Sequence, residues 1–335
     1  MAILNRSENR QPTKQNHPSL QWVWLKSTVL LISVLTSLVC FAQVPTQLKA
    51  PTQLKTPIQL KVPKARSSFD ISHDYHIKLL EKALIKASEG RAIPDIVATF
   101  DMSQGRAMAE LIKGELLDVY WLGTDTIAEH KLRAIRVPTT RGLIGYRKLI
   151  IRKESHAVFD KVNSLERLQT LVACQGTHWP DTQILKDAGL KVTTSVQYET
   201  LFKMLANRRC DYFPRGYHDY KKELELRYTL YPDLVSYDGI LLHYPFAVYF
   251  FTRHENEALA KWIEVGLHAL AKEGEIERFM QQHPLTAHVF PLTNENHALY
   301  LDIANSLLPE DTPYQDHTLW YQATDFGMKT SNKNQ

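Results

Sequence analysis

The sequence predicts an α/β protein with two similar lobes, and three observations lead to this fold class. Residues 106–121 and 198–213 share one order of amphipathic helix, tight turn, aspartate and aromatic strand. Helical and strand-like stretches alternate through most of the chain, as in sheets covered by helices. Two long strand-like runs, 143–152 and 241–251, stand on either side of the second copy. We therefore expect two lobes, joined by two crossover strands that allow closure on a ligand.

The two copies align through Asp118 and Asp211. In this alignment Leu111 falls on Met204, and the apolar residues of both helices recur three and four positions apart. One buried helix face requires this spacing. Because each helix is followed at once by a strand, each copy predicts one αβ unit of a lobe.

The elements of the first lobe follow from the same periodicities. The body is expected to begin near Arg66, and Ser103 or Gln104 opens the helix of the first copy, which ends near Gly114. The expected elements are, in order, helix 74–88, strand 95–100, helix 103–114, strand 118–121, a short helix and a strand near Ile135.

The second lobe begins after Arg152 and repeats the alternation at shorter spacing. Two amphipathic helices then close the globular body. The expected elements are helix 164–168, strand 171–174, helix 180–187, strand 191–195, helix 198–206, strand 210–213, a helix near 217–225, and the closing helices 255–270 and 274–283.

The charge of the chain is unevenly distributed. The whole chain has a net charge of +4. Residues 1–66 hold nine Lys and Arg and a single acid, Glu8. The remaining residues therefore carry 31 Lys and Arg against 35 Asp and Glu. A nucleic-acid-binding body would show a basic face, so no nucleic-acid partner is expected. We expect a monomer.

The basic N-terminus predicts export. An apolar run over residues 27–42 follows the basic stretch and ends at a small residue, Ala42, before Gln43. This pattern is typical of a cleaved signal peptide over 1–42, which implies a periplasmic protein. An uncleaved N-terminal membrane anchor is the alternative, because the apolar residues 22–25 lengthen the run.

A short repeat follows the apolar run. Prolines recur every six residues through 45–63, which forbids a continuous helix. We expect an extended Pro/Lys linker over 43–66, and a disordered polar tail over 326–335. Between them, lobe 1 is assigned to 67–150 plus 246–325 and lobe 2 to 151–245.

Two cysteines, Cys174 and Cys210, remain after the predicted signal peptide. In an exported protein they can form a disulfide. Two buried thiols are the alternative, because buried cysteine behaves as a small hydrophobic residue.

The chain contains no HExxH and no GxSxG motif, and no pair of cysteines has metal-ligand spacing. His73 and His76 are too isolated for a metal site. His178 and Asp181 are candidate acid–base partners, but they lie on one loop. Asp181 stands near a helix start, where an acidic residue is favoured in any case. We expect no catalytic residue, no metal and no cofactor.

From about residue 70 to 285 the chain resembles solute-binding protein family 3, the periplasmic proteins that serve polar amino acid transporters. The resemblance rests on the stretch 143–155, on 172–179, and on the strand and helix pair over 249–280. The motifs SQGR, YWLGT and DYFPRG together resemble a divergent Gram-negative branch of that family. The resemblance implies a fold like that of the type II periplasmic binding proteins, with two α/β lobes joined by two crossover strands.

The ligand contacts of that family transfer less completely. In the family, an arginine binds the α-carboxylate of the ligand. The position of that arginine falls near Lys131 in this chain, with Arg133 close by. The position of the family's acid, which holds an α-ammonium, falls at Arg215 and Gly216. Without that acid, the resemblance does not predict an ordinary α-amino acid as ligand.

Candidate ligand-binding residues follow from position, because ligands bind beyond the carboxyl ends of strands in α/β sheets. Arg106 opens a helix, where free N–H groups favour anions, and Arg141 lies in the loop before the first crossover. Each also has a structural alternative, a solvated charge for Arg106 and a lobe–lobe ion pair for Arg141. The eight candidates are Arg106, Trp121, Thr124, Arg141, Gly176, Thr177, Trp179 and Arg215.

Three of these candidates are arginines, whose guanidinium groups match carboxylates and phosphates. We therefore expect a small ligand that is anionic or bears a carboxylate. The expected partner beyond the ligand is an ABC permease or a membrane sensor. The alternatives are a sensory or partner-binding module without a transport role, and an enzyme resembling cyclohexadienyl dehydratase.

Overall fold

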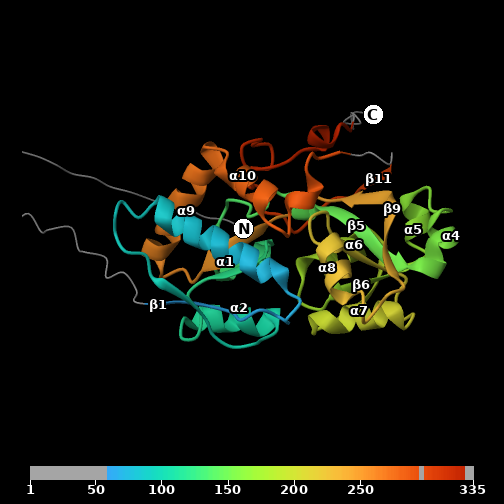
Figure 1. Ribbon diagram of the computed structural model, residues 1–335, viewed down its shortest axis with the longest axis horizontal. Coiled ribbons are helices and arrows are strands. Elements are labelled where there is room, and N and C mark those ends of the chain that lie inside the picture. Colours follow the sequence, from blue (N-terminus) through green and yellow to red (C-terminus); the bar gives the residue numbers. More distant parts are fainter. Residues whose placement is uncertain (1–58, 294–297, 329–335) are drawn as a thin grey trace, which may run out of the picture. The chain divides into compact units, whose positions relative to one another are not determined.

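The protein is described here by a computed structural model that covers residues 59–293 and 298–328. The predicted signal peptide over 1–42 and most of the predicted linker lie outside these residues. All of the described residues belong to a single unit of the chain (Figure 1). None of the helices in the described ranges is long and apolar enough to cross a membrane.

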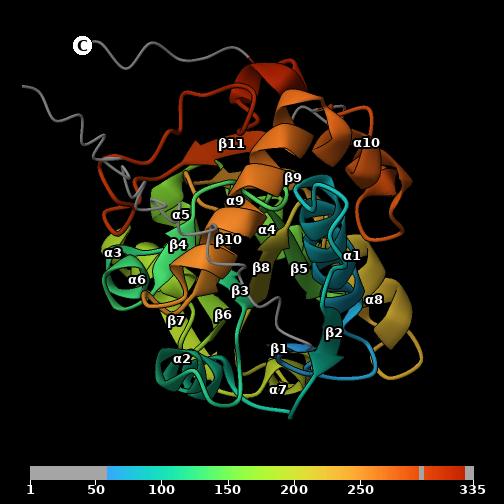
Figure 2. The ribbon, with the colours of Figure 1, turned by 90° about the vertical axis from the view of Figure 1, so that its left-hand side faces the viewer.

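Two small sheets form one part of the body, most of which the sequence assigns to lobe 1 (Figure 2). In the first, β1 (Gln59–Val62) pairs in parallel with β2 (Asp95–Ala98). The second has the order β3–β10–β4, with β10 antiparallel to both neighbours. Its strands are β3 (Tyr120–Gly123), β10 (Val248–Thr252) and β4 (Arg133–Ile135).

Five helices accompany these sheets. Figure 2 shows α9 lying over β10 and β4, and α1 packs along α9. The contact between α1 and α9 is close at Gly266, where a Cβ atom would lie 1.9 Å from the carbonyl oxygen of Ala83. The helices are α1 (Ile71–Lys86), α2 (Gln104–Lys113), α3 (Thr126–Lys131), α9 (Glu257–Lys272) and α10 (Glu275–Gln282).

A six-stranded mixed sheet forms the other part, in the order β11–β9–β5–β8–β6–β7. Its strands are β5 (Tyr146–Arg152), β6 (Val172–Gly176), β7 (Lys191–Ser195), β8 (Tyr212–Gly216), β9 (Leu234–His243) and β11 (Leu299–Asp302). Its helices are α4 (His156–Phe159), α5 (Leu165–Leu168), α6 (Pro180–Asp187), α7 (Tyr198–Ala206) and α8 (Tyr220–Arg227).

Strand β5 lies inside this sheet and is covered on both faces. All seven of its residues are buried. Leu149 and Ile151 pack into one apolar cluster, whereas Ile150 packs into another. Because successive side chains of a strand point to opposite faces, both faces of the sheet are packed here.

The run 241–251, which the sequence suggested as one long strand, is two strands in different sheets. Strand β9 ends at His243, and β10 begins at Val248. Pro245 stands between them, and proline cannot donate a ladder hydrogen bond inside a sheet. The chain therefore passes between the two sheets at residues 244–247.

The aspartates that align the two copies have the same structural role. Asp118 and Lys61 exchange two hydrogen bonds, backbone N–H to carbonyl oxygen and backbone N–H to carboxylate, both of 2.8 Å. Asp211 and Val172 exchange the same two bonds, of 2.7 and 2.8 Å. Each aspartate thus joins the loop after its helix to another strand, β1 for Asp118 and β6 for Asp211.

The lobe boundaries remain a proposal, which the strand pairings refine. Since β5 lies wholly in the six-stranded sheet, we place the first crossing before Tyr146 rather than at residue 150. Strand β11 joins the same sheet through β9, although the sequence assigned it to lobe 1.

Both ends of the predicted body need correction. The predicted linker ends too late, because β1 occupies Gln59–Val62 with Leu60 and Val62 fully buried. The predicted tail begins too early, because Phe326 is buried 4.4 Å from the ring of Tyr146. In each case alternating or aromatic apolar residues pack into the core.

Cys174 and Cys210 form a disulfide, with Cα atoms 5.5 Å apart. Both are buried in the cluster that packs α7 against the sheet. The bond joins β6 to the loop before β8. Of the two alternatives that the sequence left open, the structure therefore has the disulfide.

Candidate functional site

One cavity lies between the two small sheets and the six-stranded sheet. Its empty space, part of it open to solvent, measures about 910 Å³. The segment from β1 to α1 and the end of β3 line one side. The loops after β6 and β8 line the other. We call this space the inner cavity.

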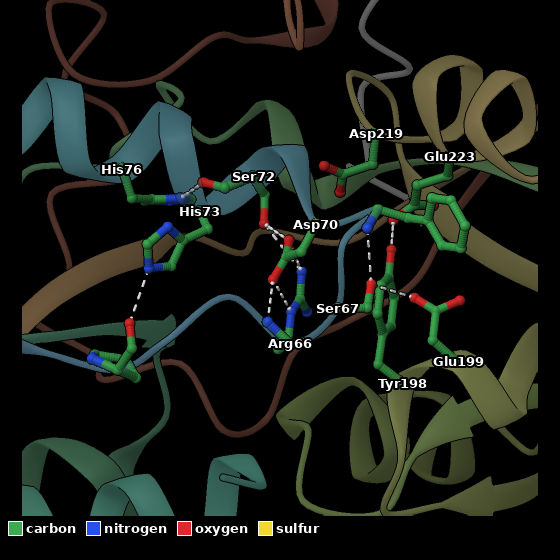
Figure 3. A network of polar contacts seen from close by, with 12 residues as sticks. Arg66, Ser67, Asp70, Ser72, His73, His76, Tyr198, Glu199, Asp219 and Glu223 are labelled. Atoms are coloured by element: carbon green, nitrogen blue, oxygen red, sulfur yellow. Dashed lines mark hydrogen bonds and ion pairs between the residues drawn. The ribbon is translucent and has the colours of Figure 1, made fainter. Parts of the chain in front are cut away.

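An ion pair from the segment before α1 forms one wall of the inner cavity (Figure 3). Arg66 donates to both carboxylate oxygens of Asp70 at 2.7 Å, and Ser72 donates to Asp70 at the same distance. Burial alone would raise the pKa of Asp70, but the Arg66 guanidinium outweighs it and holds the pKa well below its usual range. Asp70 is therefore an anion that is already neutralised.

A second buried pair comes from β5 and α6. Arg147, which is 2% exposed, forms an ion pair with Asp181, and the Tyr244 hydroxyl donates to the same carboxylate oxygen at 2.5 Å. The guanidinium also lies 5.0 Å from the centre of the Tyr244 ring. Arg147 and Asp181 both line the inner cavity.

A third cluster surrounds Arg215 at the end of β8. Arg215 donates to both oxygens of Glu223, at 2.7 and 2.6 Å, and the Tyr198 hydroxyl donates to one of them. Burial would raise the pKa of Glu223, but Arg215 outweighs it, so this pKa is lowered. Asp219 lies farther away, 3.7 Å from the Arg215 guanidinium.

Because Glu223 lies closer to Arg215 than Asp219 does, the pKa values of these two buried acids shift in opposite directions. Burial and repulsion from Glu223 raise the pKa of Asp219 to about 7. Burial and the nearby cations Arg147 and Arg215 lower the pKa of His218 to about 3. His218 is therefore neutral at physiological pH, while Asp219 changes its protonation close to neutrality.

Aromatic rings complete the walls. Trp121 stacks on His76 with ring centres 5.1 Å apart, and burial lowers the pKa of His76 to about 3. On the opposite side Trp179 stacks on Phe213 at 6.3 Å. The Arg215 guanidinium lies 5.1 Å from the Trp179 ring centre. Both tryptophans present apolar area beside charged groups.

Three polar atoms of residues that line the inner cavity are buried without a hydrogen-bond partner among the described residues. They are Arg147 Nε, His218 Nδ1 and Thr140 Oγ1. Buried polar groups are almost always paired, and leaving one unpaired costs about 1–3 kcal/mol. Three residues of the cavity lining thus each have an unpaired buried polar atom.

The eight predicted residues fall into three groups. Trp121, Trp179 and Arg215 line the inner cavity. Gly176 and Thr177 line a second cavity next to it, which Trp179 also borders. The remaining three, Arg106, Thr124 and Arg141, line neither.

The positions of these three follow from nearer partners. The Arg106 side chain is 67% exposed, 4.0 Å from Glu110 on its own helix. Thr124 is fully buried and donates to Glu129. Arg141 pairs with Glu277 of α10, as in the ion-pair alternative, though this pair does not join the two lobes as they were assigned.

Sequence reasoning missed most of the charged residues of the site. Arg66 was placed at the end of a linker, and Arg147 lies in a run that otherwise reads as a buried strand. An acid that lines the inner cavity, Asp219, follows Gly216 three residues later. A charged residue inside an apolar run was the one available signal, because such a residue is rarely buried without a partner.

The described residues contain no group of three His, Cys, Asp or Glu side chains placed to hold a metal ion. The inner cavity instead combines three arginines with carboxylates and aromatic walls. Such a site can bind a small polar molecule by charge, hydrogen bonds and ring contacts.

No family model matches the chain, and neither does any curated protein. Solved structures do match. An ancestral arginine-binding protein bound to arginine is 16% identical, covers 68% of this chain and 99% of its own, and gives a TM-score of 0.50. A histidine kinase sensor domain with similarity to periplasmic binding proteins is 14% identical, covers 68% and 95%, and also gives 0.50.

The chain thus has the two-lobed α/β fold of the type II periplasmic binding proteins. The fold class predicted from the sequence is confirmed. The predicted resemblance to solute-binding protein family 3 is confirmed at the level of the fold, and the low identities fit a divergent branch.

Proposed function

We propose that this chain is an extracytoplasmic solute-binding protein that closes two lobes around a small carboxylate-bearing ligand. The observation that carries the proposal is Arg147 Nε, a buried N–H donor that has no partner among the described residues and belongs to the wall of the inner cavity. A guanidinium nitrogen can only donate, so its partner must be an acceptor. A carboxylate supplies such an acceptor with opposite charge.

The same wall limits the net charge of the ligand. Asp70, Asp181 and Asp219 line it together with Arg66, Arg147 and Arg215. A molecule with several negative charges would meet repulsion from these acids, whereas one with a carboxylate and a cationic or donor group finds partners for both. The similar arginine-binding protein holds a ligand of that type.

Extracytoplasmic placement rests on the predicted signal peptide and on the disulfide, which persists in oxidising compartments. Uptake and sensing both use a closing two-lobed receptor. A sensory module is the second candidate, favoured by the similarity to a histidine kinase sensor domain. Neighbouring genes for a permease and an ATPase would favour uptake, and a neighbouring gene for a membrane kinase would favour sensing.

We propose binding without turnover. The acids that line the inner cavity are held by arginines, a serine and a tyrosine. Incubation with the bound ligand, followed by mass analysis, should return that ligand unchanged. Conversion at a rate that depends on Asp181 would favour the enzyme alternative.

A thermal-shift screen tests the proposal. Small carboxylates, amino acids, amines and neutral sugars are added to the full chain at equal concentrations. We expect the largest rises in melting temperature from compounds with a carboxylate, because a ligand stabilises only the state that binds it. Stabilisation by amines or neutral compounds alone would contradict the proposed ligand class.

A further inference from the structure

A second cavity adjoins the inner one, and we call it the outer cavity. The two cavities share Arg66, Met102, Gln104 and Trp179 among the residues that line them. A molecule that fills the inner cavity and extends past the Trp179 ring therefore enters the outer cavity. Both spaces are only partly enclosed, so this path leads to solvent.

Two hydrogen bonds at the outer cavity join the segment before α1 and helix α2 to helix α7 and the loop after β6. Gln104 Nε2 donates to the His178 carbonyl oxygen at 3.1 Å. Ser67 Oγ donates to Glu199 Oε1 at 2.6 Å, as Figure 3 shows. Of the four residues, Gln104, His178 and Glu199 line the outer cavity. The two bonds thus connect opposite walls of this cavity, and space remains open beside them.

The walls of the outer cavity differ in chemistry from those of the inner cavity. The lining includes several hydroxyl and amide side chains, among them Thr177, Ser195 and Gln197. Each can both donate and accept hydrogen bonds. Among the charged groups, Arg66 pairs with Asp70, and Glu199 is engaged by both Arg227 and Ser67. Asp101 is exposed. Because the arginine is already paired and both acids repel anions, these walls suit an uncharged chain with alternating donors and acceptors better than a second carboxylate.

We infer that the ligand is elongated, with a terminal carboxylate in the inner cavity and a polar, uncharged tail of peptide character in the outer cavity. This inference rests on the proposed function and adds a length and a tail chemistry to it. The protein then binds the carboxyl end of a longer molecule and does not enclose that molecule completely.

A series of ligands with one head group and increasing tail length tests this. N-acetyl-glutamate, N-acetyl-glutamine and N-acetyl-arginine are titrated calorimetrically into the full chain, beside the corresponding N-acetyl-Gly-Gly-X peptides. Since both sets carry an amide at the α-nitrogen, only the tail differs. We expect at least one peptide to bind tenfold more tightly than its short counterpart.

Matched variants then place the tail. Val196→Trp adds a bulky ring at an exposed residue of the outer cavity, and Thr170→Trp adds one at an exposed residue that lines neither cavity. The ratio of peptide affinity to short-ligand affinity should fall at least tenfold in Val196→Trp. It should stay within twofold of the wild-type ratio in Thr170→Trp.

The outcomes separate this inference from the proposed function. Binding of short carboxylates with no gain, or a loss, for the peptides overturns the inference and leaves the proposed function standing. An unchanged ratio in Val196→Trp overturns the placement of the tail and with it the inference. If no carboxylate of either length binds, both fail together.

Discussion

Arg215 illustrates how single residues build the inner cavity. Its guanidinium is held by two bonds to Glu223, which accepts a further bond from Tyr198. All three side chains are buried. A buried ion pair contributes little net stability, but removing one partner leaves an uncompensated charge. The arrangement therefore fixes the position of Arg215 more than it stabilises the fold.

Glu223→Gln should lower the free energy of unfolding by about 3–5 kcal/mol, because Arg215 loses its buried counter-charge. Denaturant unfolding of the full chain measures this change. Glu225→Gln, on the same helix, is the matched control, because Glu225 is exposed and pairs with Lys222. A loss below about 1 kcal/mol in Glu223→Gln would show that Arg215 has another partner.

Asp219 should make stability depend on pH in an unusual direction. Its pKa rises from 3.8 in the unfolded chain to about 7 in the folded protein, so the folded state binds the extra proton between these values. Stability from this group is therefore full below pH 4 and lost as pH rises through 7. A shift of this size corresponds to roughly 4 kcal/mol.

Asp219→Asn removes this dependence. The variant should gain stability relative to the wild type between pH 4 and pH 8, because asparagine needs no proton to be neutral. Denaturant midpoints at pH 4, 6 and 8 measure the difference. A difference that is constant across the three pH values would mean that Asp219 is ionised throughout.

The sequence predicted elements better than contacts. Helices 180–187 and 198–206 and strand 191–195 have the predicted bounds, because periodicity and turn residues are local properties. The bond between Arg147 and Asp181 joins residues 34 apart in sequence, so only the fold brings them together. Arg106 and Arg141 were chosen by their place in loops, but each has a partner outside the cavity.

At the scale of elements, the disulfide joins β6 to the loop before β8, beside the loops that line the inner cavity. Cys174 precedes the loop that carries Gly176 and Trp179, and Cys210 precedes the strand that carries Arg215. Arg152 donates to the carbonyl oxygens of Cys210 and Leu205 at 2.7 and 2.8 Å. Arg152 of β5 thus connects the segment just before β8 to the end of α7.

Replacing both cysteines with alanine should lower the free energy of unfolding by about 3–4 kcal/mol, the chain-entropy value for a closed loop of this length. The cysteines are 36 residues apart. Unfolding of the wild type with and without reductant provides the control, since reduced wild type should approach the variant. Equal stability of oxidised and reduced wild type would contradict this.

At the scale of the whole body, the chain crosses between the sheet systems before Tyr146 and at residues 244–247. The C-terminal segment adds contacts to both sides. Strand β11 pairs with β9, while the Tyr321 N–H donates to the Arg141 carbonyl oxygen at 2.8 Å. We expect the bends of closure at the two crossings, because β5 is held by a strand on each side.

Ligand binding should reduce the radius of gyration of the protein. A ligand shifts the equilibrium between open and closed lobes only by its higher affinity for the closed form. Small-angle X-ray scattering with and without a saturating carboxylate ligand measures the change. An unchanged radius at saturation would count against closure, although binding itself could still occur.

The central claim, that a carboxylate binds at Arg147 in the inner cavity, is tested most directly by calorimetry on two arginine variants. Arg147→Met removes the donor, and Arg167→Met, on α5, is the control because it is exposed and lines neither cavity. We predict that the carboxylate ligand from the thermal-shift screen loses at least a hundredfold in affinity with Arg147→Met and less than twofold with Arg167→Met. Wild-type affinity in a folded Arg147→Met protein would contradict the account.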